Sequence, residues 1–243
     1  MKHVFIIIYL AIVFFAGCNS DPESCFKGNG YVVKEQREIK DFSVISVNDL
    51  FVVKLYQDTV NKLFLKGPEN LLQYVEIRHI EDTLLMSNTA TCSWAREYEK
   101  ITAIVHVDSL EQVGLKKPSD LISMNRIHSP KLIIWGINDL HYVNLEVDCD
   151  QIYFKTSYST TGEFIFRGKT NYAHFWLYYA SRVIADSLKA ERVKVLHHSI
   201  GNVHVYAEKI VAAEIYSKGN VYYSGNPENV ICDDESHCFE KNN

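Results

Sequence analysis

Alternating hydrophobic and polar positions recur along most of the chain and predict β-strands. Short runs such as Phe51–Tyr56 and Ile101–Val107 are separated by turn residues such as Asn48-Asp49 and by residues 67–70. No segment repeats apolar residues at i, i+3, i+4 and i+7 for long enough to predict an amphipathic helix. The one plausible helical turn is Asn70–Tyr74, which follows a proline. The pattern predicts an all-β protein.

The second half of the chain repeats a turn signal at nearly constant spacing. Successive turns are 19, 23, 20, 20 and 18 residues apart, and each is followed by an alternating strand. A unit of this size cannot bury its apolar face alone, but stacked copies form a continuous core. The repeat therefore predicts a parallel β-solenoid, and an antiparallel sandwich with evenly spaced hairpins is the alternative. The residues at the second turn position are Asp120, Asp139, Gly162, Arg182, Asn202 and Asn220.

The alternation also assigns side chains to the interior of the solenoid, because successive residues of a strand point to opposite faces. Glycine and asparagine at the turns suit corners with positive φ, and stacked turns are expected to form an asparagine ladder. The predicted interior residues are Ile152, Phe154, Phe164, Phe166, Phe175, Leu177, Val193, Val195, Val203, Val205, Val221 and Tyr223.

Composition and charge narrow the class of protein. The chain has 243 residues, is 47% hydrophobic and carries a net charge of −5, which excludes a disordered chain. With 25 Lys+Arg against 30 Asp+Glu, nothing favours nucleic acid as a partner. No apolar segment of about 20 residues follows the apolar run at the N-terminus, so a multi-span membrane protein is also excluded.

The N-terminus has the features of a bacterial lipoprotein signal. Lys2 precedes an apolar run, Val4–Ala16, that is too short to span a bilayer comfortably, which predicts a signal peptide over residues 1–17. Phe15-Ala-Gly-Cys18 resembles a lipobox, apart from the phenylalanine in place of the usual leucine. We expect Cys18 to be lipidated and to attach the protein to a membrane through its acyl chains.

The residues after Cys18 bear on where that anchor lies. Asn19 stands where an inner-membrane retention signal would have aspartate, and Asp21 and Glu23 resemble the surface-export signal of Bacteroidetes lipoproteins. These features predict an outer-membrane lipoprotein, and they leave the periplasmic and extracellular faces as alternatives. Residues 18–31 are expected to form a tether.

Five further cysteines follow in a compartment that permits disulfides. Cys232 and Cys238 are close enough in sequence to close a small loop, and a Cys25–Cys92 pair is conceivable. Cys149 is then the odd one, and we expect it to behave as a small buried hydrophobe. No C-x-x-C motif is present to predict a zinc ribbon.

No catalytic or metal-binding motif occurs in the sequence. His197 and His198 are adjacent in a predicted strand and cannot share a face, so with His204 they are expected to be ordinary solvent-facing histidines. Carboxylates such as Asp186 and Glu163 fall at different offsets after their turns and do not form a row on successive coils. We therefore predict no catalytic residue, no metal site and no cofactor.

The aromatic run 172–179 is the strongest candidate for a binding surface. Alternation directs Phe175, Leu177 and Tyr179 inward. Exposed rings on one face are suited to a glycan or a protein partner, although loop or side-chain packing that covers them is an alternative. The residues predicted to face outward are Tyr172, His174, Trp176 and Tyr178, and neighbouring coils are expected to add Tyr153, Tyr216 and Tyr222.

Several segments together resemble a known family. Arg37–Asn48 is similar to its opening pattern, Gly201–Ala207 to one of its repeats, and Lys218–Pro227, with G-N-V-Y-Y-x-G-N-P, to its closing repeat. The family is the "putative autotransporter adhesin, head GIN domain", common among Bacteroidetes lipoproteins. The resemblance covers residues 32–232 and leaves 233–243 as a polar tail.

The resemblance implies a right-handed β-solenoid whose N-terminal strands extend or cap it. Lys116–Asp120 and Ser157–Thr161 depart from the family's Gly-Ser-Gly-Asp turns, so the coils are expected to bulge or bend there. The family name implies adhesion and carries no established catalytic residue.

The sequence as a whole predicts a non-enzymatic, lipid-anchored envelope protein for adhesion or ligand binding. Two alternatives stay open: a polysaccharide-active enzyme of the pectate-lyase type, and a structural envelope component without a discrete ligand.

Overall fold

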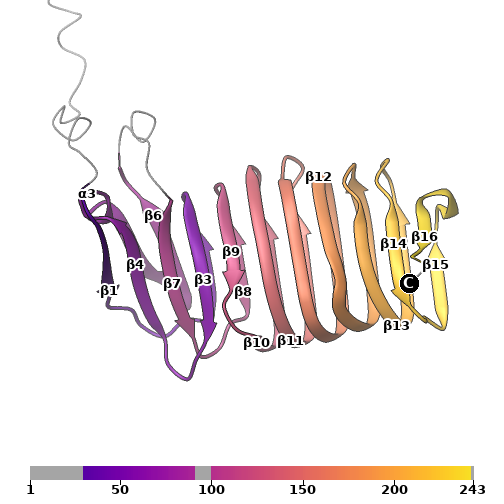
Figure 1. The fold of residues 1–243 in the computed structure, drawn as a ribbon, viewed down its shortest axis with the longest axis horizontal. Coiled ribbons are helices and arrows are strands. Elements are labelled where there is room, and N and C mark those ends of the chain that lie inside the picture. Colours follow the sequence, from indigo (N-terminus) through magenta and orange to yellow (C-terminus); the bar gives the residue numbers. More distant parts are fainter. Residues whose placement is uncertain (1–29, 91–99, 242–243) are drawn as a thin grey trace, which may run out of the picture.

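The computed structural model describes residues 30–90 and 100–241 and is a β-solenoid of about 6 turns, with 70% of the chain in strands and 3% in helices. Figure 1 shows the strands stacked side by side along one long axis. The all-β solenoid prediction is confirmed. Cys18, Cys25, Cys92 and the predicted signal peptide lie outside the described residues.

The elements of the N-terminal part are β1 (Val32–Arg37), β2 (Val44–Val47), β3 (Phe51–Gln57), β4 (Lys62–Pro68), α3 (Glu69–Leu72), β5 (Val75–Ile80), β6 (Thr83–Asn88), β7 (Ile101–Val107), β8 (Gln112–Leu115) and β9 (Ser119–Ser123). The C-terminal part contains β10 (Ile127–Gly136), β11 (Leu140–Thr156), β12 (Thr161–Ser199), β13 (Val203–Ile215), β14 (Val221–Gly225), β15 (Asn229–Cys232), the 3₁₀ turn η2 (Glu235–His237) and β16 (Cys238–Glu240). The helical turn expected over 70–74 is present as α3, one residue earlier.

The repeats pair in parallel, as a solenoid requires and a hairpin sandwich does not. β11 pairs with β10 on one side and β12 on the other, and β12 then pairs with β13. β12 is long because it forms two successive coils: residues 161–176 lie against β11, and residues 183–197 lie against β13. Each coil therefore rests on the one before it.

Every coil contributes to two walls. The first wall contains residues 119–123, 140–146, 161–167, 182–186, 203–207 and 221–225, and the second wall contains residues 131–136, 151–156, 172–177, 192–198, 210–215 and 229–232. A corner near residues 148–150 and a turn near residues 157–160 connect the walls in one coil.

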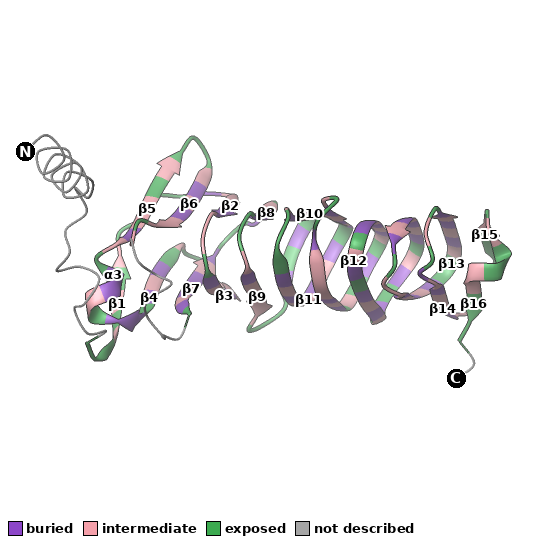
Figure 2. Ribbon diagram, turned by 90° about the horizontal axis from the view of Figure 1, so that it is seen from above, coloured by how far each residue is buried: buried purple, intermediate pink, exposed green. Residues whose placement is uncertain are grey.

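The N-terminal strands extend both walls and then end the parallel stack. β3 and β2 pair in parallel with the strands that follow them in the stack, β9 and β8. Beyond them β4 pairs antiparallel with both β1 and β7, and β5 pairs antiparallel with β6. β1 and β5 are the first and last strands in the order of the sheet and lie at the outer edges of the stack (Figure 2). The expected N-terminal cap is therefore present.

The interior follows the predicted alternation, which Figure 2 shows as bands of buried and exposed residues along the strands. Every predicted interior residue is buried except Tyr223, which is partly buried against the core. Tyr223 lies in β14, and only the short β16 covers that strand at the end of the stack. Phe154 packs against Phe164 and Phe166, with ring centroids 4.5 and 5.2 Å apart.

Two of the turn glycines serve a different purpose from the one expected. Gly201 and Gly219 do not have positive φ; a Cβ on Gly219 would lie 2.3 Å from the Gly201 carbonyl oxygen, and one on Gly201 would lie 2.4 Å from that of Ser181. Close approach between stacked turns, rather than a left-handed backbone, requires glycine here. Positive φ occurs, as expected, at two other turn positions, Asn138 and Gly162.

The asparagine ladder is short. The Asn220 backbone N–H donates to Asn202 Oδ1 at 3.1 Å, and Asn220 Oδ1 lies 2.7 Å from His237 Nδ1. At the turn between the walls, buried hydroxyl groups also form hydrogen bonds between neighbouring coils. Ser199 Oγ donates to the Ser181 carbonyl at 2.8 Å, and Ser181 Oγ donates to the Thr160 carbonyl at 3.2 Å. Each bond links one coil to its neighbour, so these hydroxyls satisfy backbone groups that the turns leave unpaired.

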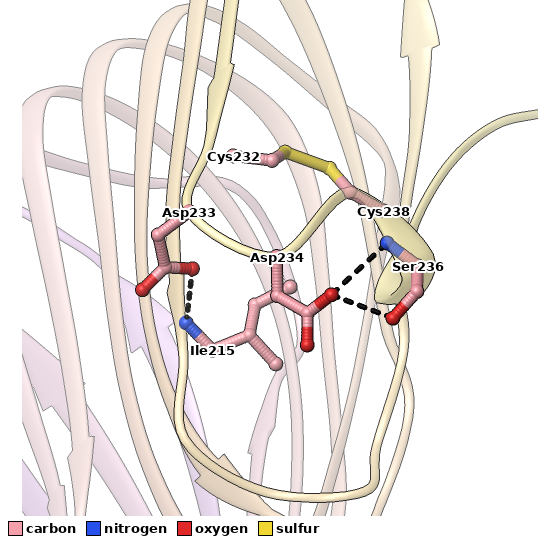
Figure 3. Close-up of a disulfide and its surroundings, with 6 residues drawn as sticks. All are labelled: Ile215, Cys232, Asp233, Asp234, Ser236 and Cys238. Carbon is pink, nitrogen blue, oxygen red and sulfur yellow. Dashed lines mark hydrogen bonds between the residues drawn. A yellow bond between two sulfur atoms is a disulfide. The ribbon is translucent and has the colours of Figure 1, made fainter.

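The C-terminal end is closed by a disulfide (Figure 3). Cys232 ends β15 on the second wall, Cys238 begins β16 beside β14, and the two sulfurs are bonded. Within the loop, Asp234 accepts hydrogen bonds from the Ser236 backbone N–H and hydroxyl, and Asp233 accepts one from the Ile215 N–H at 2.8 Å. Residues predicted as a polar tail thus include a strand that covers the last coil.

No helix in the part of the chain that the structure describes is long and apolar enough to cross a membrane.

Candidate ligand-binding groove

The outer face of the second wall brings together side chains that are about 20 residues apart in sequence. The parallel register aligns Ile133 with Tyr153 and His174 in one column. It aligns Trp135 with Lys155 and Trp176 in the next column. Because residues two apart in a strand share a face, both columns point outward beside each other.

A groove runs between these columns. Its cavity volume is about 240 Å³, and the residues around it are Lys131, Ile133, Trp135, Tyr153, Phe154, Lys155, His174 and Trp176. A second cavity of about 250 Å³ shares Lys131 and Ile133 with the first and is also bordered by Val44, Glu111, Gln112 and Pro130. The two cavities together cross the strands β2, β8, β10, β11 and β12, which are neighbours in the second wall.

Two lysine ammonium groups lie over the aromatic rings of the groove. Lys155 Nζ is 3.7 Å from the ring centroid of Trp176 and 5.1 Å from that of Trp135. Lys131 Nζ is 5.2 Å from the ring centroid of Tyr153. Neither ammonium forms an ion pair with a carboxylate among the described residues. The groove therefore combines apolar ring surface with two positive charges that no acidic side chain neutralises.

His174 and Tyr172 complete the aromatic side of the groove. The rings of Tyr172 and His174 meet the ring of Tyr153 edge to face at 5.8 and 5.9 Å. Burial, together with the nearby charge of Lys194, lowers the pKa of His174, so this imidazole is neutral at pH 7. Burial raises the pKa of the Tyr172 phenol. The rings form a neutral, packed platform beside the lysines.

The predicted aromatic residues divide into those that border the groove and those that do not. Tyr172, His174 and Trp176 lie on the outer face, as expected. Tyr178 is only 9% exposed, because the ring of Tyr158 covers it at 4.2 Å and that of His198 stacks on it at 4.8 Å. For Tyr178 the alternative of a covered ring is therefore correct.

Two other aromatic assignments were wrong. Tyr179 was expected inside, but it is 58% exposed with a φ of 58°, because the chain turns there and the alternation stops. Tyr222 lies on the first wall, stacked on His204 at 4.8 Å, and does not join the aromatic surface. Tyr216 lies on the second wall and stacks on His198 at 4.5 Å.

Sequence reasoning missed Trp135, Lys155 and Lys131, although a signal was present. Trp135, Lys155 and Trp176 are 20 and 21 residues apart, which is the period of the repeat. Alignment of the strands that precede the turns would have placed all three in one column.

The histidines do not form a metal site. His197 and His198 do point to opposite sides, but His197 is fully buried instead of solvent-facing, and neither of its ring nitrogens has a hydrogen-bond partner within residues 30–90 and 100–241. Burial lowers the pKa of His197 to about 4, so it is neutral in the core at pH 7. Across the described residues, no three His, Cys, Asp or Glu side chains are placed to hold a metal ion.

The carboxylates Asp186 and Glu163, which the sequence excluded as a catalytic row, lie outside the groove and are paired, and so is Asp148. Asp148 Oδ2 is 3.2 Å from Lys169 Nζ, Asp186 Oδ1 is 3.1 Å from Lys241 Nζ, and Glu163 Oε2 is 3.4 Å from Arg182 Nη1. None of them borders the first cavity. Cys149 is a free, buried thiol whose pKa burial raises to about 12, so it is not a nucleophile at neutral pH.

Comparison with known proteins shows which family has this fold. The protein is a β-solenoid with solved relatives that are described as adhesins. The model of the family described as "Putative auto-transporter adhesin, head GIN domain" matches residues 41–227, so the chain belongs to this family. A search of the curated proteins finds no match.

Two solved structures illustrate the likeness. A "putative adhesin" from Bacteroides fragilis NCTC 9343 superposes with a TM-score of 0.74 at 17% identity, over 87% of this chain and 94% of that one. A "putative lipid binding protein" from Parabacteroides distasonis ATCC 8503 has a TM-score of 0.64 at 16% identity, over 88% and 98% of the two chains. At these identities the likeness establishes the fold. The family and the Bacteroides fragilis protein are described as adhesins, the Parabacteroides distasonis protein as a lipid binding protein, and none of these names is that of an enzyme.

Proposed function

We propose that this protein is a lipid-anchored, adhesin-like binding protein of the outer membrane, without enzymatic activity, and that its ligand occupies the groove on the second wall. The observation that carries the proposal is the lining of that groove: packed rings and two unpaired ammonium groups, with no carboxylate around the first cavity. Half-buried aromatic rings that border an open groove are typical of a recognition site.

The anchor part of the proposal rests on the sequence. Residues 1–17 and Cys18 have the pattern of a lipoprotein signal, and the family model supports an adhesin-like protein of the envelope. The rigid stack would hold the groove away from the membrane, at the end of the tether formed by residues 18–31.

The enzyme alternative lacks support in the groove. Glycoside hydrolysis requires two carboxyl groups about 5 to 9.5 Å apart across the scissile bond. The ring-lined cavity borders no Asp or Glu, and Glu111 is the one carboxylate bordering the adjoining cavity.

The first test concerns the anchor and the surface location. Replacing Cys18 by serine in the full-length protein is expected to abolish incorporation of labelled fatty acid and to release the protein from the outer-membrane fraction. Protease treatment of intact cells then separates the two faces: digestion is expected for a surface protein. Unchanged membrane association of the Cys18→Ser variant would contradict the proposed anchor.

The second test concerns the groove. Full-length protein in detergent micelles is applied to a glycan array and to envelope or host-surface proteins, beside the Trp135→Ala and Trp176→Ala variants. Tyr206→Ala serves as the control, because Tyr206 lies on the first wall. We expect both tryptophan variants to lose at least tenfold in affinity and the control to bind normally. Equal binding by all four proteins would show that the groove is not the binding site.

A further inference from the structure

The groove has a direction as well as a composition. The two cavities follow the solenoid axis across five neighbouring strands, and they do not run along one strand. With strands about 4.8 Å apart, this path is about 19 Å long. A site of this shape suits a linear polymer lying across the rungs better than a compact small molecule.

The ring surfaces repeat along that direction. Trp135 and Trp176 lie two strands apart in the same column, so their backbones are separated by about 9.5 Å along the axis, and Lys155 Nζ lies near both rings. Tyr153 and His174 flank them in the adjacent column. Flat aromatic rings pack well against the C–H faces of sugar rings, and a repeated row of rings suits a chain of such residues.

The charged groups of the groove indicate which kind of polymer would bind. On the same wall, Lys194 Nζ is neutralised by Glu214 at 3.0 Å, whereas Lys131 and Lys155 have no acidic partner among the described residues. Positive groups collected in a groove of a protein with a net charge of −5 indicate an anionic ligand.

We infer that the groove binds a linear acidic polysaccharide, a chain of carboxylate-bearing sugars that lies along the solenoid axis. The sugar faces pack on Trp135, Tyr153 and Trp176, and the carboxylates pair with Lys131 and Lys155. The inference deepens the proposed function and depends on it, because it assumes that the groove is the binding site.

Other polyanions fit less well. Nucleic acid would also stack and carry charge, but the chain is acidic overall and offers only a few cations in the groove. An anionic membrane surface would require an extended basic face, whereas the positive charges here lie in a recessed groove.

The test measures binding of an oligogalacturonate to full-length protein in detergent micelles, by calorimetry and by tryptophan fluorescence. Its methyl ester is the matched ligand control, since it keeps the sugar chain and removes the charge. We expect the acid to bind at least tenfold more tightly than the ester. Lys131→Gln and Lys155→Gln should each lower the affinity for the acid by about tenfold and leave the affinity for the ester unchanged, because each removes one charge-assisted contact.

Further variants distinguish a failure of the acidic-polysaccharide inference from a failure of the proposed function. Trp176→Ala should weaken both acid and ester, and Trp176→Phe should restore part of the affinity. Glu163→Gln, on the first wall, is the control and should change neither.

Ester binding as tight as acid binding, or an acid preference that survives both lysine changes, would overturn the acidic-polysaccharide inference while leaving the groove as a site. Equal binding of single-stranded DNA would overturn it too, since charge alone would then suffice. If no acidic oligosaccharide binds but another ligand depends on Trp176, the inference fails and the proposed function stands. Cleavage of the oligogalacturonate would contradict the non-enzymatic proposal itself.

Discussion

The two walls of the solenoid share one core and one repeat, yet their outer faces treat charge differently. On the first wall, charged side chains pair across neighbouring coils, as Glu163 does with Arg182, and Asp186 pairs with Lys241. On the second wall, Lys131 and Lys155 lie over aromatic rings and have no carboxylate partner among the described residues.

The difference separates a structural surface from a recognition surface. Exposed ion pairs between coils contribute between about 0 and 1 kcal/mol each and leave no charge for a ligand. Ammonium groups held over rings keep their positive charge available and are partly dehydrated already. The first wall therefore carries paired charges, and the second wall carries the Lys194–Glu214 pair beside a groove whose two cations stay available to a ligand.

The largest expected effect tests whether both faces lie over one shared core. Phe164 is fully buried and packs on Phe154, so Phe164→Ala should lower the free energy of unfolding by about 3–5 kcal/mol. Its neighbour Ile165 points outward on the first wall, and Ile165→Ala should cost less than about 1 kcal/mol. Denaturant titration measures both values, and equal costs would contradict the assignment of faces.

The next effect depends on pH. The pKa of His197 is about 4 in the folded protein and 6.5 ordinarily, so between these values the unfolded chain binds a proton that the folded chain does not. The free energy of unfolding therefore decreases as the pH falls from 6.5 towards 4, and His197 contributes about 3 kcal/mol to that decrease. The free energy of unfolding of His197→Leu, measured from pH 7 to pH 4, should fall correspondingly less. Parallel pH profiles for the two proteins would show that His197 is not responsible.

A smaller effect is expected from opening the C-terminal loop. Replacing both Cys232 and Cys238 by serine removes a short cross-link and should cost about 2 kcal/mol. Hydrogen exchange should rise mainly in β14, β15 and β16, far along the axis from the groove. Ligand affinity should stay unchanged; a loss of groove binding would mean that the cap and the groove are coupled.

The smallest effect contrasts the two faces directly. Arg182→Gln removes an exposed pair and should cost less than about 1 kcal/mol, with a cost that shrinks in high salt. Lys155→Gln should likewise change stability little, yet only this variant should alter the affinity of the groove. Thermal melts and binding titrations on the two variants test this difference. An effect of Arg182→Gln on ligand affinity would contradict the assignment of binding to the second wall.

The sequence predicted the fold well because the repeat is local. Alternation identified interior residues such as Phe154 and Val205, and the turn spacing identified the coils. It failed at Tyr179, where a residue with positive φ ends the alternation, and at His197, whose polar side chain is fully buried in the core.

For the groove, the sequence identified Tyr172, His174 and Trp176 from one strand. It could not show that Tyr178 is covered, because Tyr158 comes from the turn of the preceding coil. It also gave Gly201 and Gly219 the wrong reason, since the distance between stacked turns is set by the coils on either side.

The sequence by itself determined which side chains point inward and that the units repeat, because burial of apolar surface and the two-residue period of a strand act within each segment. Only the tertiary structure decided which outward side chains become neighbours. Trp135, Lys155 and Trp176 meet because the parallel register between three coils aligns them. That register depends on the length and geometry of every intervening turn, which no single segment encodes.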